Sequence, residues 1–207
     1  MRVLIINGSP KNNGNTATAL GEMIKVFEAS GVEVDYFNVG NQDIHGCVGC
    51  GTCYKNGKCF MDDCVNELAP RLEACDGMVI GSPVYYAAPN GTLISLLNRL
   101  FYSTRFDKRM KVGASVAVAR RGGCSTTFDQ LNKYFTISGM PLASSQYWNS
   151  VHGAKPGEAE GDLEGLQTMR TLAENMIFLM RSIELGKEKY GLPEREKALR
   201  TNFIRQL

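Results

Sequence analysis

The sequence alternates short runs of branched apolar residues with longer segments of helical periodicity, and this alternation is what most constrains the fold. Runs suited to buried strands occupy residues 3–7, 32–39, 77–81, 112–119 and 142–147. Helical periodicity occurs at residues 16–29, 65–73, 91–102, 126–138, 163–185 and 194–206. Strands and helices that alternate with short connections are typical of a doubly wound parallel sheet. We therefore expect an α/β fold with five parallel strands, helices on both faces and a C-terminal helical extension over residues 163–207.

Length and composition favour one domain over residues 1–207, because 43 % of the residues are apolar and no linker or repeat divides the chain. The 23 basic and 21 acidic side chains leave a net charge of +2, which argues against a nucleic-acid or membrane-surface partner. No stretch approaches the roughly 20 apolar residues that span a bilayer, and residues 3–6 are too short for the core of a signal peptide. We therefore expect a cytoplasmic protein.

The loop after the first predicted strand has the composition of a phosphate-binding loop. Residues 8–16 read Gly-Ser-Pro-Lys-Asn-Asn-Gly-Asn-Thr and lead into a helix N-terminus, where backbone amides and the helix dipole favour an anion. Polar donors are available from Ser9, Asn15 and Thr16, and a countercharge from Lys11. The motif lacks the Gly-Lys-Ser/Thr ending of a P-loop and the Gly-x-Gly-x-x-Gly dinucleotide fingerprint. It suits one terminal phosphate monoester held without a metal, and a helix N-cap by Ser9 or Asn15 is the alternative.

Two further polar loops are expected at the same edge of the sheet, because ligands of doubly wound sheets bind outside the carboxyl ends of the strands. The loop after the third predicted strand combines a rigid turn with two aromatic side chains, in the order Ser82, Pro83, Val84, Tyr85 and Tyr86. It can form an edge for a flat heterocycle. The loop after the fourth strand allows close backbone approach at Gly122 and Gly123, and carries positive charge at Arg120 and Arg121. Two solvated arginines are the alternative, which we favour for Arg121.

These motifs resemble those of the flavodoxin-like NAD(P)H-dependent FMN reductase superfamily. Gly-Ser-Pro-Lys-x-x-Gly-Asn-Thr is similar to its FMN phosphate loop, and Gly81-Ser-Pro-Val-Tyr85 is similar to its isoalloxazine-contacting loop. The resemblance covers roughly residues 1–150. It implies a flavodoxin-like, FMN-binding protein that works as a homodimer or homotetramer. The implied FMN contacts are Ser9, Lys11, Asn15, Thr16, Pro83, Val84, Tyr85, Tyr86, Arg120, Gly122 and Gly123.

Five of the seven cysteines fall within residues 47–64. In a reducing compartment, clustered thiols indicate metal ligands or redox groups. Two residues separate Cys47 from Cys50, and two more separate Cys50 from Cys53, so these thiolates can converge. Five residues, including an Asn-Gly turn, separate Cys53 from Cys59, which can supply a fourth thiolate.

This spacing resembles the iron–sulfur flavoprotein branch of the same superfamily, in which the loop binds a [4Fe–4S] cluster close to the flavin of a neighbouring subunit. The implied ligands are Cys47, Cys50, Cys53 and Cys59, with Cys64 as a substitute fourth ligand. Two other interpretations stay open. The thiols bind Zn²⁺, although all-cysteine zinc sites usually consist of two separated Cys-x-x-Cys pairs. Alternatively they hold no metal, either as redox-active thiols or as an inherited loop.

Three features outside these motifs carry structural expectations. The isolated Cys75 and Cys124 are expected to be small buried side chains. The Gly-rich stretch 153–165 is either a loop that covers a site or a surface connection, and we favour the surface connection. The helix at residues 163–185 is apolar nearly all round, as deep core or an interface requires, which adds to the expectation of a homo-oligomer.

The sequence therefore predicts an FMN-dependent oxidoreductase. No paired carboxylates or Ser/His/Asp set stands out, as expected where a flavin carries the chemistry. The resemblance implies that NAD(P)H reduces the flavin, which passes electrons to a quinone, another small acceptor or an iron–sulfur cluster. The alternative is an iron–sulfur electron carrier that receives electrons from a ferredoxin and has no small-molecule substrate of its own. A metal- or redox-sensing protein that uses the thiols is a third hypothesis.

Overall fold

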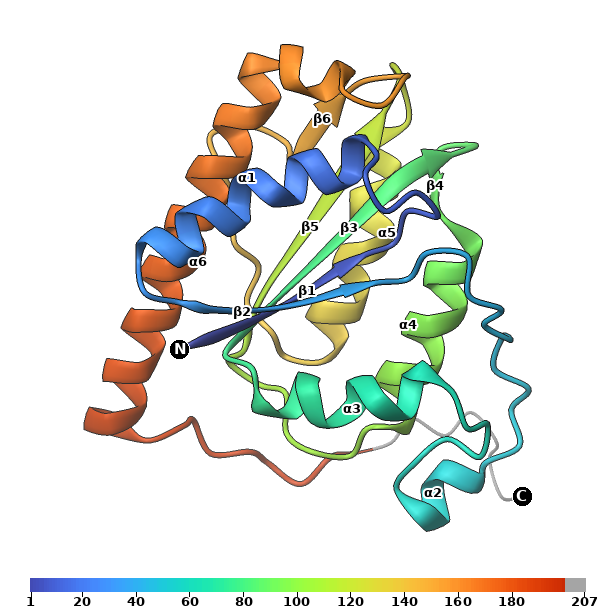
Figure 1. Ribbon diagram of the computed structural model, residues 1–207. Helices are drawn as coiled ribbons and strands as arrows, with labels where there is room; N and C mark the ends of the chain where they lie inside the picture. Colours follow the sequence, from blue (N-terminus) through green and yellow to red (C-terminus); the bar gives the residue numbers. More distant parts are fainter. Residues whose placement is uncertain (200–207) are drawn as a thin grey trace, which may run out of the picture.

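The chain forms a parallel β-sheet covered by helices on both faces (Figure 1). The computed structural model describes residues 1–199. The strands lie in the order β2 (Glu33–Asn38), β1 (Arg2–Asn7), β3 (Gly77–Tyr85), β5 (Val112–Ala119) and β6 (Ser150–His152). All neighbours in this order pair in parallel. A two-residue strand, β4 (Ala88–Pro89), pairs antiparallel with the end of β3.

The sheet separates two hydrophobic cores. The helices are α1 (Asn15–Ala29) and α6 (Leu163–Tyr190) on one face, and α3 (Cys64–Ala74), α4 (Gly91–Ser103) and α5 (Cys124–Ile137) on the other (Figure 1). Alternate side chains of β1 point into different cores, with Val3 and Ile5 on the α1/α6 side and Leu4 and Ile6 on the opposite side. Because both faces are covered, the strands read as continuous apolar runs, as the sequence indicates.

The strand order places a topological switch point next to β1. The chain passes from β1 through α1 to β2 on one side, and then through α3 to β3 on the other side of β1. This is the flavodoxin-like order, and ligands of such sheets bind where the order reverses, outside the carboxyl ends of the strands. The α/β fold and its parallel sheet are as predicted.

The last strand is shorter and later than the sequence predicts. The predicted strand at residues 142–147 is joined to the sheet by an isolated bridge between Gly113 and Leu142, and the strand itself is β6, Ser150–His152. In between, the Ser145 hydroxyl donates to the Tyr147 carbonyl at 2.6 Å and to Asn149 Oδ1 at 2.8 Å. Such local bonds compete with a strand ladder, which explains why this segment turns back on itself.

The apolar residues of α6 are largely accounted for by packing within the chain. Buried against α1 and the sheet are Met169, Leu172, Met176, Ile177 and Met180, each at most 5 % exposed. The apolar pattern of α6 therefore reflects burial in the core of the chain. It gives no separate support for a homo-oligomer. No helix in the described part of the chain is long and apolar enough to cross a membrane.

The predicted helix at residues 194–206 is wrong where the structure describes it. Residues 194–199 have no regular secondary structure, and the remainder of that prediction lies outside the described residues. Gly191, with φ +72°, caps the end of α6, and Pro193 follows it. Residues 194–199 are exposed, and a short helix that does not pack against the rest of the chain is only marginally stable in water.

Candidate functional site

A cavity of about 260 Å³ lies where β1, β3 and β5 end. The structure brings together there the residues predicted to bind the cofactor phosphate, namely Ser9, Lys11, Asn15 and Thr16. The hairpin residues predicted to face the ring join them, namely Pro83, Val84 and Tyr85. Arg120 lines the cavity from the end of β5. Among the described residues that line it, two are cationic and none is acidic, so the cavity suits an anion.

The phosphate loop, residues 8–14, is fixed to the neighbouring strand by backbone contacts. The Gly8 amide donates to the Gly81 carbonyl at 2.8 Å, which ties the loop to β3. The Ser9 amide donates to Asn7 Oδ1 at 3.0 Å, and Ser9 Oγ accepts from the Lys11 amide at 3.1 Å. A Cβ on Gly8 would lie 3.0 Å from the Gly81 carbonyl oxygen, so the close approach requires glycine.

The N-terminus of α1 carries no side-chain cap. Its N-cap residue is Gly14, and no side-chain cap hydrogen bond occurs there. The alternative of a helix cap is therefore wrong, because Ser9 bonds within its own loop and Asn15 Oδ1 accepts from the Ala159 amide at 3.2 Å. The first amides of a helix need partners, and here they border an acid-free cavity, which is the arrangement that binds phosphate.

The hairpin between β3 and β4 is a tight turn with unusual backbone geometry. Its two central residues, Tyr86 and Ala87, have φ +51° and +57°, as a two-residue type I′ hairpin requires. Tyr86, also predicted to contact the cofactor, is fully exposed at the tip and does not line the cavity. The base of the hairpin is held by Ser82 Oγ, which accepts from the Asn90 amide at 3.0 Å.

Gly122 and Gly123, also predicted to contact the cofactor, lie outside the cavity lining. Gly123 supports the hairpin instead, because a Cβ there would come within 2.9 Å of both Ala87 Cα and Val84 Cγ1. Its φ of +91° is a second reason for glycine at the start of α5.

Sequence reasoning missed the loop at residues 153–165, which we expected to be a surface connection. Gly153, Ala154 and Pro156 line the cavity, and Ala159 is fully buried beneath the loop. The available signal was its place directly after the last strand, at the edge where the other binding loops lie.

A second, small cavity of about 20 Å³ lies between the cysteine loop and α4. The loop contains the short helix α2 (Thr52–Asn56) and projects beside α3 and α4, at the lower right of Figure 1, whereas β4 lies at the upper right. Four thiols line this cavity, from Cys47, Cys50, Cys53 and Cys59. The two cavities share no lining residue.

Cys64 does not line the cavity with these four thiols. It is the first residue of α3, is 7 % exposed and packs in the core. Burial, with the negative charges of Asp63 and Glu67, raises the pKa of the Cys64 thiol to about 11. Such a thiol resists forming the thiolate that binds metals. The geometry therefore groups Cys59, and not Cys64, with the other three.

The four thiols supply the kind and number of donors that an iron–sulfur cluster takes. A [4Fe–4S] cluster takes one cysteine on each of four irons, so its ligands surround a volume instead of meeting at one atom. In the described residues, no three His, Cys, Asp or Glu side chains are arranged to hold a single metal ion. Hydrogen bonds from the side chain and backbone of Thr52 lower the pKa of the exposed Cys50 thiol and favour its thiolate.

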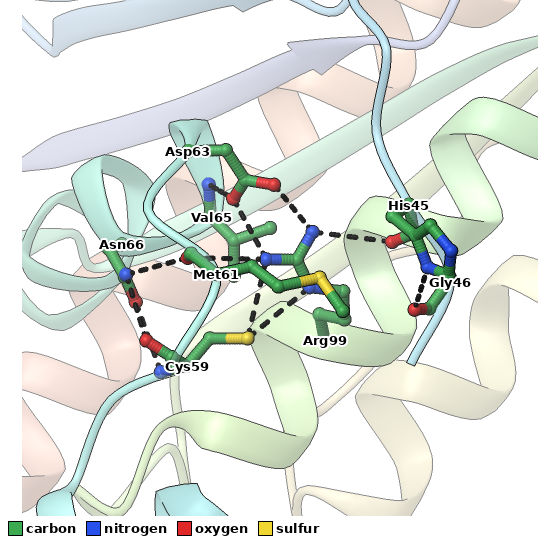
Figure 2. Close-up of polar contacts among 8 residues, drawn as sticks. All are labelled: His45, Gly46, Cys59, Met61, Asp63, Val65, Asn66 and Arg99. Atoms are coloured by element: carbon green, nitrogen blue, oxygen red, sulfur yellow. Dashed lines mark hydrogen bonds and ion pairs between the residues drawn. The ribbon is translucent and has the colours of Figure 1, made fainter. Parts of the chain in front are cut away.

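Arg99, on α4, lines the cysteine cavity and makes most of the polar contacts drawn in Figure 2. Its side chain is 1 % exposed and contacts Asp63 with nitrogen–oxygen distances of 2.5 and 2.9 Å. Its Nε and Nη2 donate to Cys59 Sγ at 3.4 and 3.3 Å. Further bonds reach the carbonyls of His45 at 3.2 Å and Met61 at 3.4 Å. One guanidinium thus joins the two ends of the cysteine loop.

Asn66 fixes the segment of the cysteine loop that carries Cys59. Its Oδ1 accepts from the Cys59 amide at 3.1 Å, and its Nδ2 donates to the Cys59 and Met61 carbonyls at 3.0 Å each. Asp63 caps α3 by accepting from the Val65 amide at 3.1 Å (Figure 2). The start of α3 and the cysteine loop therefore form one hydrogen-bonded unit.

The two isolated cysteines differ in burial. Cys75 is 1 % exposed, as predicted, and its thiol donates to the Leu72 carbonyl at 3.2 Å. Burial raises the pKa of Cys75 to about 11. Cys124 begins α5 and is half-buried, so its prediction of burial is met only in part.

A family model described as NADPH-dependent FMN reductase matches residues 1–155. The chain belongs to this family. An iron–sulfur flavoprotein from Methanocaldococcus jannaschii is 31 % identical over 192 residues, covering 89 % of this chain and all of that relative. An iron–sulfur flavoprotein from Methanosarcina thermophila is 28 % identical, covering 91 % of this chain and all of the relative. These relatives place the chain in the iron–sulfur flavoprotein branch of the family.

Solved structures support the fold of this FMN reductase family member. The structure of RosB with a bound 8-demethyl-8-formylriboflavin-5′-phosphate intermediate has a TM-score of 0.72 at 14 % identity, covering 98 % of this chain and 92 % of that one. A flavodoxin from the domain Archaea has a TM-score of 0.59 at 13 % identity, covering 87 % and 99 %. The flavodoxin-like fold implied by the resemblance is confirmed.

The cavity at the strand ends fits the FMN that the family binds. The uncapped amides of α1, together with Lys11, suit the phosphate. The rigid wall of Pro83, Val84 and Tyr85 suits a flat ring.

Proposed function

We propose that this protein moves electrons between FMN, bound at the strand ends, and a [4Fe–4S] cluster bound by the cysteine loop. The observation that supports it is the grouping of Cys47, Cys50, Cys53 and Cys59 around one cavity in a chain of the FMN reductase family. FMN, when bound, supplies one- and two-electron redox chemistry. No acid–base side chain is needed for that chemistry.

The chain's own residues bind and orient the flavin in this proposal. The α1 amides and the Ser9 and Thr16 hydroxyls would donate to the phosphate, and Lys11 would offset its charge. The wall from Pro83 to Tyr85 would hold the ring, and the positive charge of Arg120, which also lines the cavity, would stabilise negative charge on a reduced ring. The loop at residues 153–156 excludes water from one side.

Two kinds of electron donor are candidates for reducing the flavin. The family description supports NADPH as the donor, and in this case the flavin would pass electrons to the cluster, a quinone or another small acceptor. The names of the relatives and the cysteine cavity support an iron–sulfur electron carrier, and for this carrier we propose a ferredoxin as the donor.

Stopped-flow mixing without oxygen decides between these donors. The holoprotein is mixed with NADH, NADPH or reduced ferredoxin, with flavin bleaching and the EPR signal of the reduced cluster as readouts. Reduction by a nicotinamide at least as fast as by ferredoxin supports the reductase. Fast reduction by ferredoxin alone supports the carrier, and no flavin reduction by any of the three contradicts the proposed function.

A homodimer or homotetramer follows from the same proposal. The two cavities share no lining residue within one chain, and the resemblance implies that the cluster lies beside a neighbouring subunit's flavin. Exposed apolar side chains surround the cysteine cavity, including Val48 and Phe60, each 54 % exposed. Contact between subunits buries such surface. Light scattering at micromolar concentration tests this, and a monomeric mass for the FMN- and iron-loaded protein contradicts it.

A further inference from the structure

Arg99 is a buried cation that contacts one of the four cavity-lining cysteines. Removing a charged side chain from water is costly unless it is paired and hydrogen-bonded. Here the Asp63 carboxylate pairs with the guanidinium, and the His45 carbonyl and Cys59 Sγ accept further N–H bonds from it. Arginine is not deprotonated in proteins, so Arg99 carries a positive charge.

The direction of its donors singles out Cys59. Both Nε and Nη2 point at the Cys59 sulfur, at 3.4 and 3.3 Å, so one edge of the planar fork meets the sulfur (Figure 2). Nη1 and Nη2 make the pair with the Asp63 carboxylate. A lysine ammonium is a point charge and cannot reproduce both contacts at once.

We infer that Arg99 raises the reduction potential of the cluster by donating N–H···S hydrogen bonds to Cys59, and that Asp63 limits this effect. The inference rests on the proposed function. Reduction adds one electron to the cluster and increases the negative charge shared by its thiolates. Hydrogen bonds to the sulfurs and a nearby positive charge favour that reduced state, whereas a nearby carboxylate disfavours it. Arg99 and Asp63 are thus positioning residues with opposite effects on one measurable quantity.

Two substitutions separate this role from a purely structural one. Arg99→Lys keeps a positive charge but loses the paired contact with Cys59. Asp63→Asn removes the negative charge but keeps the α3 cap, because asparagine is as good an N-cap as aspartate. A purely structural role predicts that both variants lose iron or stability. It does not predict that the reduction potential falls in Arg99→Lys and rises in Asp63→Asn.

Arg105 offers a matched control. Its guanidinium lies over the ring of Tyr54, 4.2 Å from the ring centroid, on the same side of the molecule as the cysteine loop. Arg105→Gln also removes a positive charge there, and Arg105 makes no described hydrogen bond to a cysteine sulfur.

The test is an anaerobic redox titration of the holoproteins, monitored by EPR of the reduced cluster, with iron measured for each sample. We expect Arg99→Lys to disfavour reduction about tenfold, which corresponds to about 59 mV for one electron. Asp63→Asn shifts the potential upward, and Arg105→Gln shifts it less than Arg99→Lys does.

Several results overturn the inference. If Arg99→Lys retains its iron and its cluster potential is unchanged, the inference is overturned, whereas the proposed function is not affected. If Arg99→Lys loses its iron, Asp63→Asn decides, and an unchanged or lower potential there overturns the inference. Wild-type protein that holds FMN but no iron overturns the proposed function and this inference together.

Discussion

Asn15 Oδ1 accepts a hydrogen bond from the Ala159 amide at 3.2 Å, across 144 positions of sequence. This bond joins the first residue of α1, directly after the phosphate loop, to the loop at residues 153–165. A Cβ on Gly153 would come within 2.7 Å of Asn15 Nδ2 and 2.8 Å of the Ala159 amide nitrogen, so the three residues meet without spare room. Two walls of the FMN cavity are therefore one packed unit.

Gly153→Ala should weaken FMN binding about tenfold. The added methyl group must displace Asn15 or Ala159, and overpacking of this kind costs about 1–3 kcal/mol. A loss of about 1.4 kcal/mol in the bound state is a factor of ten in Kd. Fluorescence titration of the apoprotein with FMN measures it. Gly161→Ala is the matched control, because a Cβ there meets no atom within 4 Å. Wild-type affinity in Gly153→Ala would show that this contact does not shape the cavity.

Cys59 and Cys64 should behave differently when each is changed to alanine. Cys59→Ala is expected to abolish cluster assembly, because it removes one of the four thiols around the cavity. Cys64→Ala is expected to keep iron and lose about 1 kcal/mol of stability, because it only trims a buried side chain. Iron analysis and urea unfolding measure the two effects. Iron lost from Cys64→Ala and retained by Cys59→Ala would reverse the ligand assignment.

The buried Cys75 thiol makes stability fall at high pH. Its pKa is raised from 9.0 to about 11 by burial, so the unfolded chain loses the proton first as the pH rises. The stabilisation is complete below pH 9 and is lost as the pH passes through 11, by about 2.7 kcal/mol at 1.36 kcal/mol per unit. Urea unfolding at pH 8 and at pH 11, where the folded thiol is half ionised, should show a fall larger by about 2.3 kcal/mol in wild type than in Cys75→Ser. Equal falls in both proteins would contradict the assignment.

A glycine at position 87, at the tip of the β3–β4 hairpin, should relieve backbone strain in the turn. Ala87 has φ +57°, a left-handed conformation that costs a residue with a Cβ about 1–2 kcal/mol. Ala87→Gly is therefore expected to raise the free energy of unfolding by about 1 kcal/mol, whereas Ala88→Gly, in β4, should lower it by about 0.5–1 kcal/mol. Thermal unfolding compares the two. Destabilisation by Ala87→Gly equal to that of Ala88→Gly would mean that the turn is not strained.

Local pattern was enough to predict the sheet and to place residues 9–16 and 83–85 together at one edge of it, because each of these segments is encoded within a few consecutive residues. The contact of Gly153 with Asn15 was not predictable in this way, since it depends on how two distant loops meet. The three-residue β6 was missed because its pairing is with β5, and its own sequence carries no clear alternation.

Arg99 left a signal that the sequence reasoning did not use. It interrupts the apolar residues of α4 close to Leu96, Leu97 and Leu100, all fully buried. A charged residue on the buried side of a helix requires partners. The partners themselves, Asp63 and Cys59, could be found only from the structure.

The central claim is that FMN and a [4Fe–4S] cluster reside on this one chain. Its most direct test is the content of iron and acid-labile sulfide per FMN in protein purified without oxygen. The account predicts about four of each per FMN, as one [4Fe–4S] cluster requires. FMN without iron or sulfide would contradict it and would leave a flavin reductase whose cysteine loop is a metal-free structural or redox element.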